Sequence, residues 1–171
     1  MRALLYRISD RLPRPRIIYD RAGRSPYLSR WYIFGAPKMP DGSQPFDEYG
    51  GPRDAVIWGD KRWGLYLHRF HRGDADVELH NHPWRWARSL ILAGGYVEER
   101  RVGDAVIVRK VCPGTLNRID ADDFHRVDLL EHDAWSLFLV GPKFQGWGFW
   151  NRSTGRFTPW REFIAQFREP S

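Results

Sequence analysis

Two histidines separated by one residue can bind the same metal ion when they lie on a β-strand. His80 and His82 stand in the segment Glu-Leu-His-Asn-His-Pro-Trp at 78–84. Alternate residues of a strand point to the same face, with Cα atoms about 6.5–7 Å apart, so both ring nitrogens can lie about 2 Å from one ion. Pro83 cannot donate a hydrogen bond to a neighbouring strand, so the strand should end there. We therefore predict a divalent metal at the end of a strand.

A third ligand must come from another strand, and His125 is the best candidate. It begins an apolar strand pattern after an acidic, turn-like stretch, and the chain between His82 and His125 has room for two or three strands. Three neutral imidazoles leave coordination positions open, which suits Fe²⁺ first, and also Zn²⁺, Mn²⁺ or Ni²⁺. The alternative is that His80 and His82 are solvated histidines beside a turn.

Several polar and aromatic residues near these histidines are candidates for work on a substrate. Arg88 and Arg118 can anchor a carboxylate or phosphate, because a guanidinium binds such groups through two hydrogen bonds. Tyr66 can donate a hydrogen bond, and His68 alternates with it and so can face the same interior. Trp135 can line the mouth of the predicted barrel. We predict catalytic roles for Tyr66 and Arg88, and substrate binding by Arg88, Arg118, Trp135 and His68; ordinary packing or surface roles are the alternative.

The elements that must position these side chains are short strands. Short apolar runs separated by Gly, Pro and Asp turns, without strand–helix alternation, predict an antiparallel sandwich or barrel. Short helices are predicted at both ends, over 3–12 and 159–167. The predicted strands are 63–70, 77–82, 89–93, 96–102, 105–111, 125–130, 134–140 and 147–150.

The histidine segments resemble the two sequence motifs of cupins. Residues 73–82 carry a glycine followed by the His-x-His pair, and residues 118–127 bring the last histidine. The resemblance covers about residues 60–145 and is closest to small bacterial and phage cupins with a His-x-His-Pro-Trp signature. It implies an all-β antiparallel double-stranded β-helix (a cupin or jelly-roll barrel) with short terminal helices and a metal site. It names no substrate.

The sequence departs from the cupin pattern where that pattern has a glutamate. The corresponding stretch, 85–89, reads Arg-Trp-Ala-Arg-Ser and holds no carboxylate. The resemblance therefore implies three histidine ligands without a glutamate. It favours dioxygenase-like chemistry at such a site over glutamate-dependent oxalate degradation.

A length of 171 residues fits one domain that buries a real core. We predict a single cupin domain over 1–171. Residues 1–60 form an amino-terminal extension that packs on the barrel, 61–150 form the barrel core, and 151–171 form a carboxy-terminal segment with a short helix.

Composition bears on the compartment and on partners. Cys112 is the single cysteine, which excludes an intramolecular disulfide, and we expect it to be a small buried side chain. No run approaches the roughly 18 apolar residues of a membrane span, and Asp10 and Arg11 interrupt the first apolar residues, so we expect a cytoplasmic protein without a secretory signal. The net charge of +6 is compatible with acidic partners, and the alternative, which we favour, is an ordinary solvated surface rich in arginine.

These observations support three hypotheses of function. The first is a mononuclear metal-dependent enzyme, dioxygenase-, isomerase- or lyase-like, that acts on a small anionic molecule. The second is a cupin that binds a small molecule or a metal without chemistry. The third, and least favoured, is binding of nucleic acid or a phage component through the arginine-rich first third of the chain. The resemblance to cupins also implies a homodimer.

Overall fold

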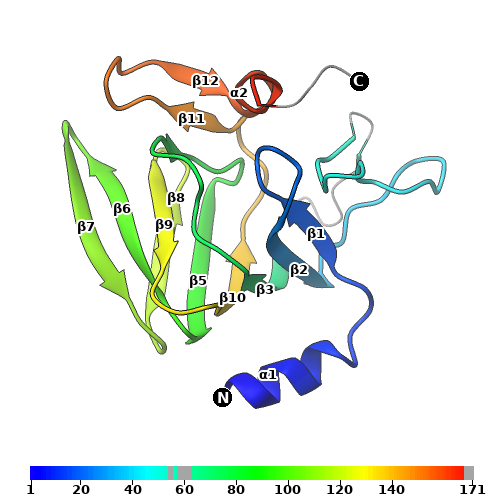
Figure 1. The fold of residues 1–171 in the computed structure, drawn as a ribbon. Coiled ribbons are helices and arrows are strands. Elements are labelled where there is room, and N and C mark those ends of the chain that lie inside the picture. Colours follow the sequence, from blue (N-terminus) through cyan, green and yellow to red (C-terminus); the bar gives the residue numbers. More distant parts are fainter. Residues whose placement is uncertain (54–55, 58–62, 168–171) are drawn as a thin grey trace.

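The computed structural model describes residues 1–53, 56–57 and 63–167. Two antiparallel sheets of six strands face each other in this part of the chain, with a short helix near each end (Figure 1). In chain order the elements are α1 (Arg2–Ser9), β1 (Arg16–Tyr19), β2 (Pro26–Phe34), β3 (Gly64–Phe70), β4 (Leu79–His80), β5 (Trp86–Ala93), β6 (Tyr96–Val102), β7 (Ala105–Val111), β8 (Leu116–Asp120), β9 (His125–Leu129), β10 (Ala134–Val140), β11 (Gly148–Trp150), β12 (Phe157–Pro159) and α2 (Trp160–Ala165).

Eight of these strands pair as a set of nested hairpins. Strand β6 pairs with β7, β5 with β8, β4 with β9, and β3 with β10, all antiparallel. When such a long hairpin rolls up, successive pairs fall alternately into two sheets, and this is the jelly-roll arrangement. The resulting strand orders are β1-β2-β3-β10-β5-β8 and β12-β11-β4-β9-β6-β7. The antiparallel double-stranded β-helix predicted from the sequence is confirmed.

The space between the sheets is filled largely by aromatic and aliphatic side chains. One cluster brings Tyr66, Trp84 and Phe138 together, and a second contains Ile91 and Tyr96. Strand β5 shows the underlying pattern, since its residues alternate between half-buried and buried along the whole strand. The interior therefore arises from the period-2 alternation that the sequence already displays.

Helix α1 packs on the outer face of one sheet, held there by the carboxylate of Asp133. This side chain is 1% exposed and accepts hydrogen bonds from Arg2 Nε at 3.0 Å, Tyr6 Oη at 2.7 Å, Arg69 Nε at 3.1 Å and Trp135 Nε1 at 3.1 Å. Burial alone would raise the pKa of Asp133, but the hydrogen bonds from Tyr6, Trp135 and Arg69 outweigh burial and hold this pKa below its usual value.

Several predicted elements have the expected bounds and others differ. Strands β6, β7 and β10 coincide with their predicted ranges. Strand β8 was missed because its pattern is inverted, with Leu116 exposed and Asn117 buried. Strands β1, β2 and β12 were also missed, and β4 covers only the middle of its predicted range. Beyond His80, the Asn81 backbone amide donates to the Gly148 carbonyl at 3.1 Å, and the Asn81 side chain accepts a hydrogen bond from the Gly148 backbone amide at 2.9 Å.

Both ends of the chain differ in detail from the prediction. The first 60 residues contribute β1 and β2 to one of the sheets, so this extension is part of the barrel wall. The predicted boundary between 60 and 61 lies outside the described residues. Helix α1 is shorter than predicted, with Leu5 facing the sheet and Leu4 exposed. Cys112 is exposed, because it stands in the turn after β7, which corrects the expectation of a buried side chain.

Within the described residues, no helix combines the length and the apolar character that crossing a membrane requires.

We predict that Asp133→Ala lowers the free energy of unfolding by about 3 kcal/mol, because it leaves buried donors and a cation without their acceptor. The lowered pKa of Asp133 means that the carboxylate stabilises the fold above its unfolded pKa of about 4 and that this contribution is lost on further acidification. The gap between wild type and variant should therefore narrow below pH 4. Urea unfolding followed by tryptophan fluorescence measures both effects. Asp104→Ala, in an exposed turn, is the control, and an equally small effect of both substitutions would contradict the role of Asp133.

Candidate metal centre

The pairing of β4 with β9 places two of the three predicted ligands opposite each other. His80 and His125 are direct cross-strand partners, and His82 follows two residues after His80. The ligand nitrogens of the three side chains all lie within 4.8 Å of one another. The ring centroids are 5.0 to 5.2 Å apart. The nested hairpin thus brings His125 to the His-x-His pair, as the sequence predicts.

The donor set fits one divalent ion. His82 Nε2 and His125 Nε2 are 2.9 Å apart, and two nitrogens about 2.1 Å from an ion and at right angles to each other are about 3 Å apart. His80 and His82 are available as neutral ligands. Burial lowers the pKa of His80 to about 4 and that of His82 well below its usual value. An uncharged imidazole is the form that binds a metal.

Glu98, which the sequence analysis did not single out, orients His125. It is fully buried on β6, and its Oε1 accepts a hydrogen bond of 2.7 Å from His125 Nδ1. This bond puts the ring proton on Nδ1 and leaves Nε2 directed at the other histidines. Burial alone would raise the pKa of Glu98, but contacts with His125, Asn117 and Arg100 outweigh burial and lower it. Glu98 is therefore an ionised acceptor that fixes the ring of His125.

A second carboxylate, on the loop after β3, lies near His80. Asp74 Oδ2 is 3.9 Å from His80 Nδ1 and accepts a hydrogen bond of 2.6 Å from the Val127 backbone amide. Its other oxygen accepts a hydrogen bond of 2.7 Å from Tyr27 Oη. Asp74 is thus fixed by two partners and faces the ring of His80 on the side away from Nε2.

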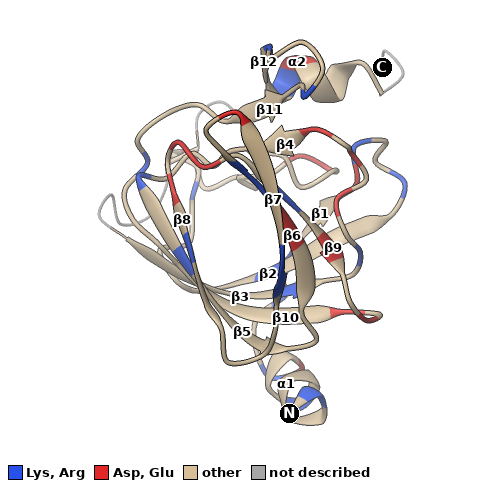
Figure 2. Cartoon of the chain, turned by 90° about the vertical axis from the view of Figure 1, so that its left-hand side faces the viewer, with Lys and Arg blue, Asp and Glu red and all other residues tan. Residues whose placement is uncertain are grey.

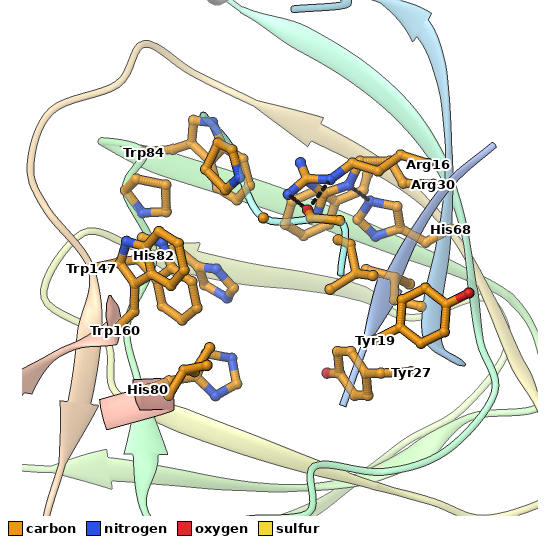
Figure 3. Close-up of a pocket in the computed structure, with 18 of the residues that line it drawn as sticks. Arg16, Tyr19, Tyr27, Arg30, His68, His80, His82, Trp84, Trp147 and Trp160 are labelled. Atoms are coloured by element: carbon orange, nitrogen blue, oxygen red, sulfur yellow. Dashed lines mark hydrogen bonds between the residues drawn. The ribbon is translucent and has the colours of Figure 1, made fainter. Parts of the chain in front are cut away.

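A cavity of about 510 Å³ opens from the three histidines. Figure 3 shows histidine and tryptophan side chains on one side of it and Arg16, Arg30 and His68 on the other. None of the described residues that line it is an aspartate or glutamate. The cationic lining residues are Arg16, Arg30, Arg53, Lys143 and Arg161. The cavity therefore has a positive wall that favours anions.

Segments from distant parts of the chain form the rim of the cavity. The loop segment 49–53 lines one side, and Trp160 and Arg161 of α2 line another. Arg161 Nη2 donates a hydrogen bond of 3.2 Å to the Pro52 carbonyl and so joins the two segments. Trp160 stacks on Trp147 with ring centroids 5.5 Å apart. The rim thus lies outside the nested hairpin that carries the histidines.

The structure places His68, but not the other substrate candidates, at the cavity. His68 lines it and accepts a hydrogen bond of 2.8 Å from Arg30 Nε. Arg88 and Arg118 lie outside it on the other face of their strands, where Arg88 contacts the Asp120 carboxylate at 3.2 Å and Arg118 is exposed. This outward placement follows from the strand period, since their buried neighbours face the interior.

The other two candidates are packing residues. Trp135 is completely buried beneath α1, on the outer face of the sheet. Tyr66 belongs to the core cluster with Trp84 and Phe138 and is not among the side chains that line the cavity. Burial raises the pKa of Tyr66 to about 12. The residues that the sequence analysis missed, Arg16 and Arg30, lie on β1 and β2, and the signal that could have found Arg30 is a single charge inside the apolar run of β2.

The nested strand order and the facing sheets define a double-stranded β-helix, so the chain has the cupin fold, and the resemblance seen in the sequence is confirmed at this level. No family model matches the sequence, and neither does any curated protein. Among solved structures, the chain is similar to KdgF from Halomonas sp., with 16% identity, a TM-score of 0.46, and coverage of 71% of this chain and 85% of that one.

Two further solved structures show comparable similarity. One is an uncharacterized conserved protein with a double-stranded beta-helix domain from Klebsiella pneumoniae, at 12% identity, a TM-score of 0.46, and coverage of 72% of this chain and 84% of that one. The other is DMSP lyase DddQ from Ruegeria pomeroyi, at 16% identity, a TM-score of 0.43, and coverage of 70% and 49%. These similarities concern the fold alone.

We predict that Glu98→Ala lowers the affinity for a divalent metal by about 10- to 100-fold, because His125 loses the acceptor that orients it. Competition with a chromophoric chelator measures this affinity. Glu98→Gln keeps an acceptor oxygen and should lie closer to wild type. Glu99→Ala is the matched control, since Glu99 pairs with Arg126 and Arg152 instead. Equal affinities for the Glu98→Ala and Glu99→Ala variants would show that Glu98 does not act on the metal centre.

Proposed function

We propose that this protein is a mononuclear metal-dependent enzyme that acts on a small anionic molecule. The observation that carries the proposal is the convergence of three imidazoles on one side of a cavity whose described lining contains cations and no carboxylates. A metal there would be accessible from the cavity, and an anion would be attracted to it.

His80, His82 and His125 would hold the ion through their ring nitrogens, with Fe²⁺ as the first choice and Zn²⁺, Mn²⁺ or Ni²⁺ as alternatives. A bound divalent ion would supply Lewis-acid polarisation of a substrate oxygen or, for iron, activation of O₂. Dioxygenase-like chemistry is the reaction class that we favour, and isomerase- or lyase-like chemistry is the alternative.

The side chains of this protein would bind the substrate and exclude water. Trp84, Phe138 and Trp147 form apolar walls around the histidines, and such walls strengthen electrostatic contacts by lowering the local dielectric. The pKa of Lys143 is lowered to about 8, mainly by burial and secondly by the positive charge of Arg16. Lys143 is thus a lining group whose ammonium ion can give up a proton near neutral pH.

A non-catalytic cupin that binds a small molecule or a metal is the second candidate. It is favoured by the position of Glu98, which is fully buried and contacted by His125, Arg100 and Arg109, and so is not open to a substrate. Among the described residues no other carboxylate replaces it as a general base on the cavity wall.

Binding of nucleic acid gains no support from the arrangement of charge. Arg16 and Arg30 from the arginine-rich first third line the cavity, and Arg2 pairs with Asp133. Lys and Arg are spread over many elements and interleaved with Asp and Glu (Figure 2). This arrangement differs from the continuous basic face that phosphate binding requires.

We predict that the protein purified without added metal carries about one divalent ion per chain and that His82→Ala removes it together with turnover. Elemental analysis measures the ion, and O₂ consumption and product formation on a panel of small acids measure turnover. His132→Ala, at a side chain that is 70% exposed, is the control. Full turnover by metal-free protein would contradict the enzyme proposal, and ligand binding to the metal-loaded protein without turnover on the panel would favour the binding alternative.

A further inference from the structure

Arg30 is a buried cation at the cavity without a carboxylate partner among the described residues. It is 8% exposed, its Nε donates to His68 Nε2 at 2.8 Å, and its guanidinium lies 5.2 Å from the ring of Tyr66 and 5.7 Å from that of Trp84. Its two terminal nitrogens make no hydrogen bond to the described residues. A buried charge is costly unless an opposite charge or hydrogen-bond acceptors compensate it, so these nitrogens are suited to an anion supplied by a ligand.

Arg16, the second arginine on this side of the cavity, uses its donors in hydrogen bonds within the protein. Arg16 Nε donates to the Gly50 carbonyl at 2.7 Å, and its Nη1 donates to Tyr32 Oη at 3.1 Å. Its guanidinium also stacks on Phe46 at 3.9 Å from the ring centroid. Arg16 therefore connects the loop to the barrel and adds positive charge, whereas the terminal nitrogens of Arg30 have no hydrogen-bond partner among the described residues.

His68 holds Arg30 in a fixed orientation. Because Arg30 Nε donates to His68 Nε2, the ring carries its proton on Nδ1, and this buried atom has no partner in the described structure. Burial, followed by the charges of Arg30 and Arg16, holds the pKa of His68 well below its usual value, so the ring is neutral. A neutral acceptor restrains Arg30 without neutralising it, and a restrained donor binds an anion with a smaller loss of side-chain entropy.

Aromatic rings separate Arg30 from the candidate metal centre. The Trp84 ring lies 5.7 Å from the guanidinium carbon of Arg30 and 5.7 Å from the ring of His82. The ring centroid of Phe138 lies 4.7 Å from that of His68 and 6.3 Å from that of His82. Figure 3 shows Arg30 and His82 on opposite sides of the cavity. Because Arg30, these rings and the histidines all line the same cavity, one small molecule along the apolar wall can contact both ends.

We propose that the ligand of this cavity is a carboxylic acid with a flat or apolar body, whose carboxylate binds the terminal nitrogens of Arg30 while its other end lies at the three histidines. This inference rests on the proposed function and specifies its substrate class. One planar guanidinium matches one planar carboxylate through two parallel hydrogen bonds. A phosphate dianion carries two negative charges and three terminal oxygens. The single charge and the two terminal nitrogens of Arg30 compensate only part of them.

The test compares matched probes on the metal-loaded protein by titration calorimetry. The probes are 3-phenylpropionate, its uncharged amide 3-phenylpropionamide, and 2-phenylethyl phosphate. Wild type should bind the acid at least tenfold more tightly than the amide and more tightly than the phosphate. Arg30→Gln should abolish the preference for the acid, a loss of about 30-fold in affinity, while leaving the amide nearly unchanged. Arg30→Lys, which keeps the charge without the planar fork, should recover only part of the preference.

Arg118→Gln is the matched control, because it removes a positive charge on the outer face of β8. If this variant and Arg30→Gln have the same effect, or if the acid and the amide bind wild type equally or not at all, the proposal is overturned. Tighter binding of the phosphate would overturn the assignment to carboxylic acids. Metal content and turnover are measured on the same samples. If the Arg30 variants show no change in acid binding while the metal and turnover are retained, the substrate-class proposal fails and the proposed enzyme function still stands. The comparison of acid with amide on wild type holds even if a variant does not fold.

Discussion

The candidate site depends on holding three imidazoles close together in a position where burial disfavours a positive charge on His80 and His82. Like charges at these ring separations would repel each other strongly, and burial removes the water that would solvate them. Neutral rings avoid this cost, and each has one nitrogen lone pair that a shared cation can bind. The nested hairpin makes the cluster unavoidable, because pairing β4 with β9 places His80 opposite His125.

The same constraint explains where the carboxylates of the interior lie. The Glu98 carboxylate accepts hydrogen bonds from four side chains, so its negative charge is compensated inside the barrel wall and does not face the cavity. The four are His125, Asn117, Arg100 and Arg109. Asp74 is likewise occupied by Tyr27 and a backbone amide. Each carboxylate supports a histidine from behind, so the described cavity surface keeps histidines, cations and aromatic rings. The positive character of the cavity comes from its arginine and lysine side chains, since the described carboxylates beside the histidines do not line it.

The sequence predicts this site only where a local pattern reports on burial. The His-x-His spacing at the end of β4 and the strand pattern of β9 identify the three histidines, and apolar alternation identifies strands such as β10. Arg88 was predicted as an anion anchor and Arg30 was not, and the facing of their strands reverses that choice, since Arg30 lines the cavity and Arg88 does not. Glu98 stands in the run Glu-Glu-Arg-Arg of 98–101, which has no apolar contrast to reveal the inward residue. Buried polar residues supported by distant partners require the tertiary fold to be found.

The rim built from the loop segment 49–53 and helix α2 has an evolutionary consequence. These segments flank the hairpin in the chain and meet through Arg161 and the Pro52 carbonyl. Insertions, deletions or exchanges there can reshape the entrance without shifting the register of β4 against β9. Homologues can therefore differ in the ligands that enter the cavity while keeping the same histidine wall. We expect their sequences to differ most in length at these two segments.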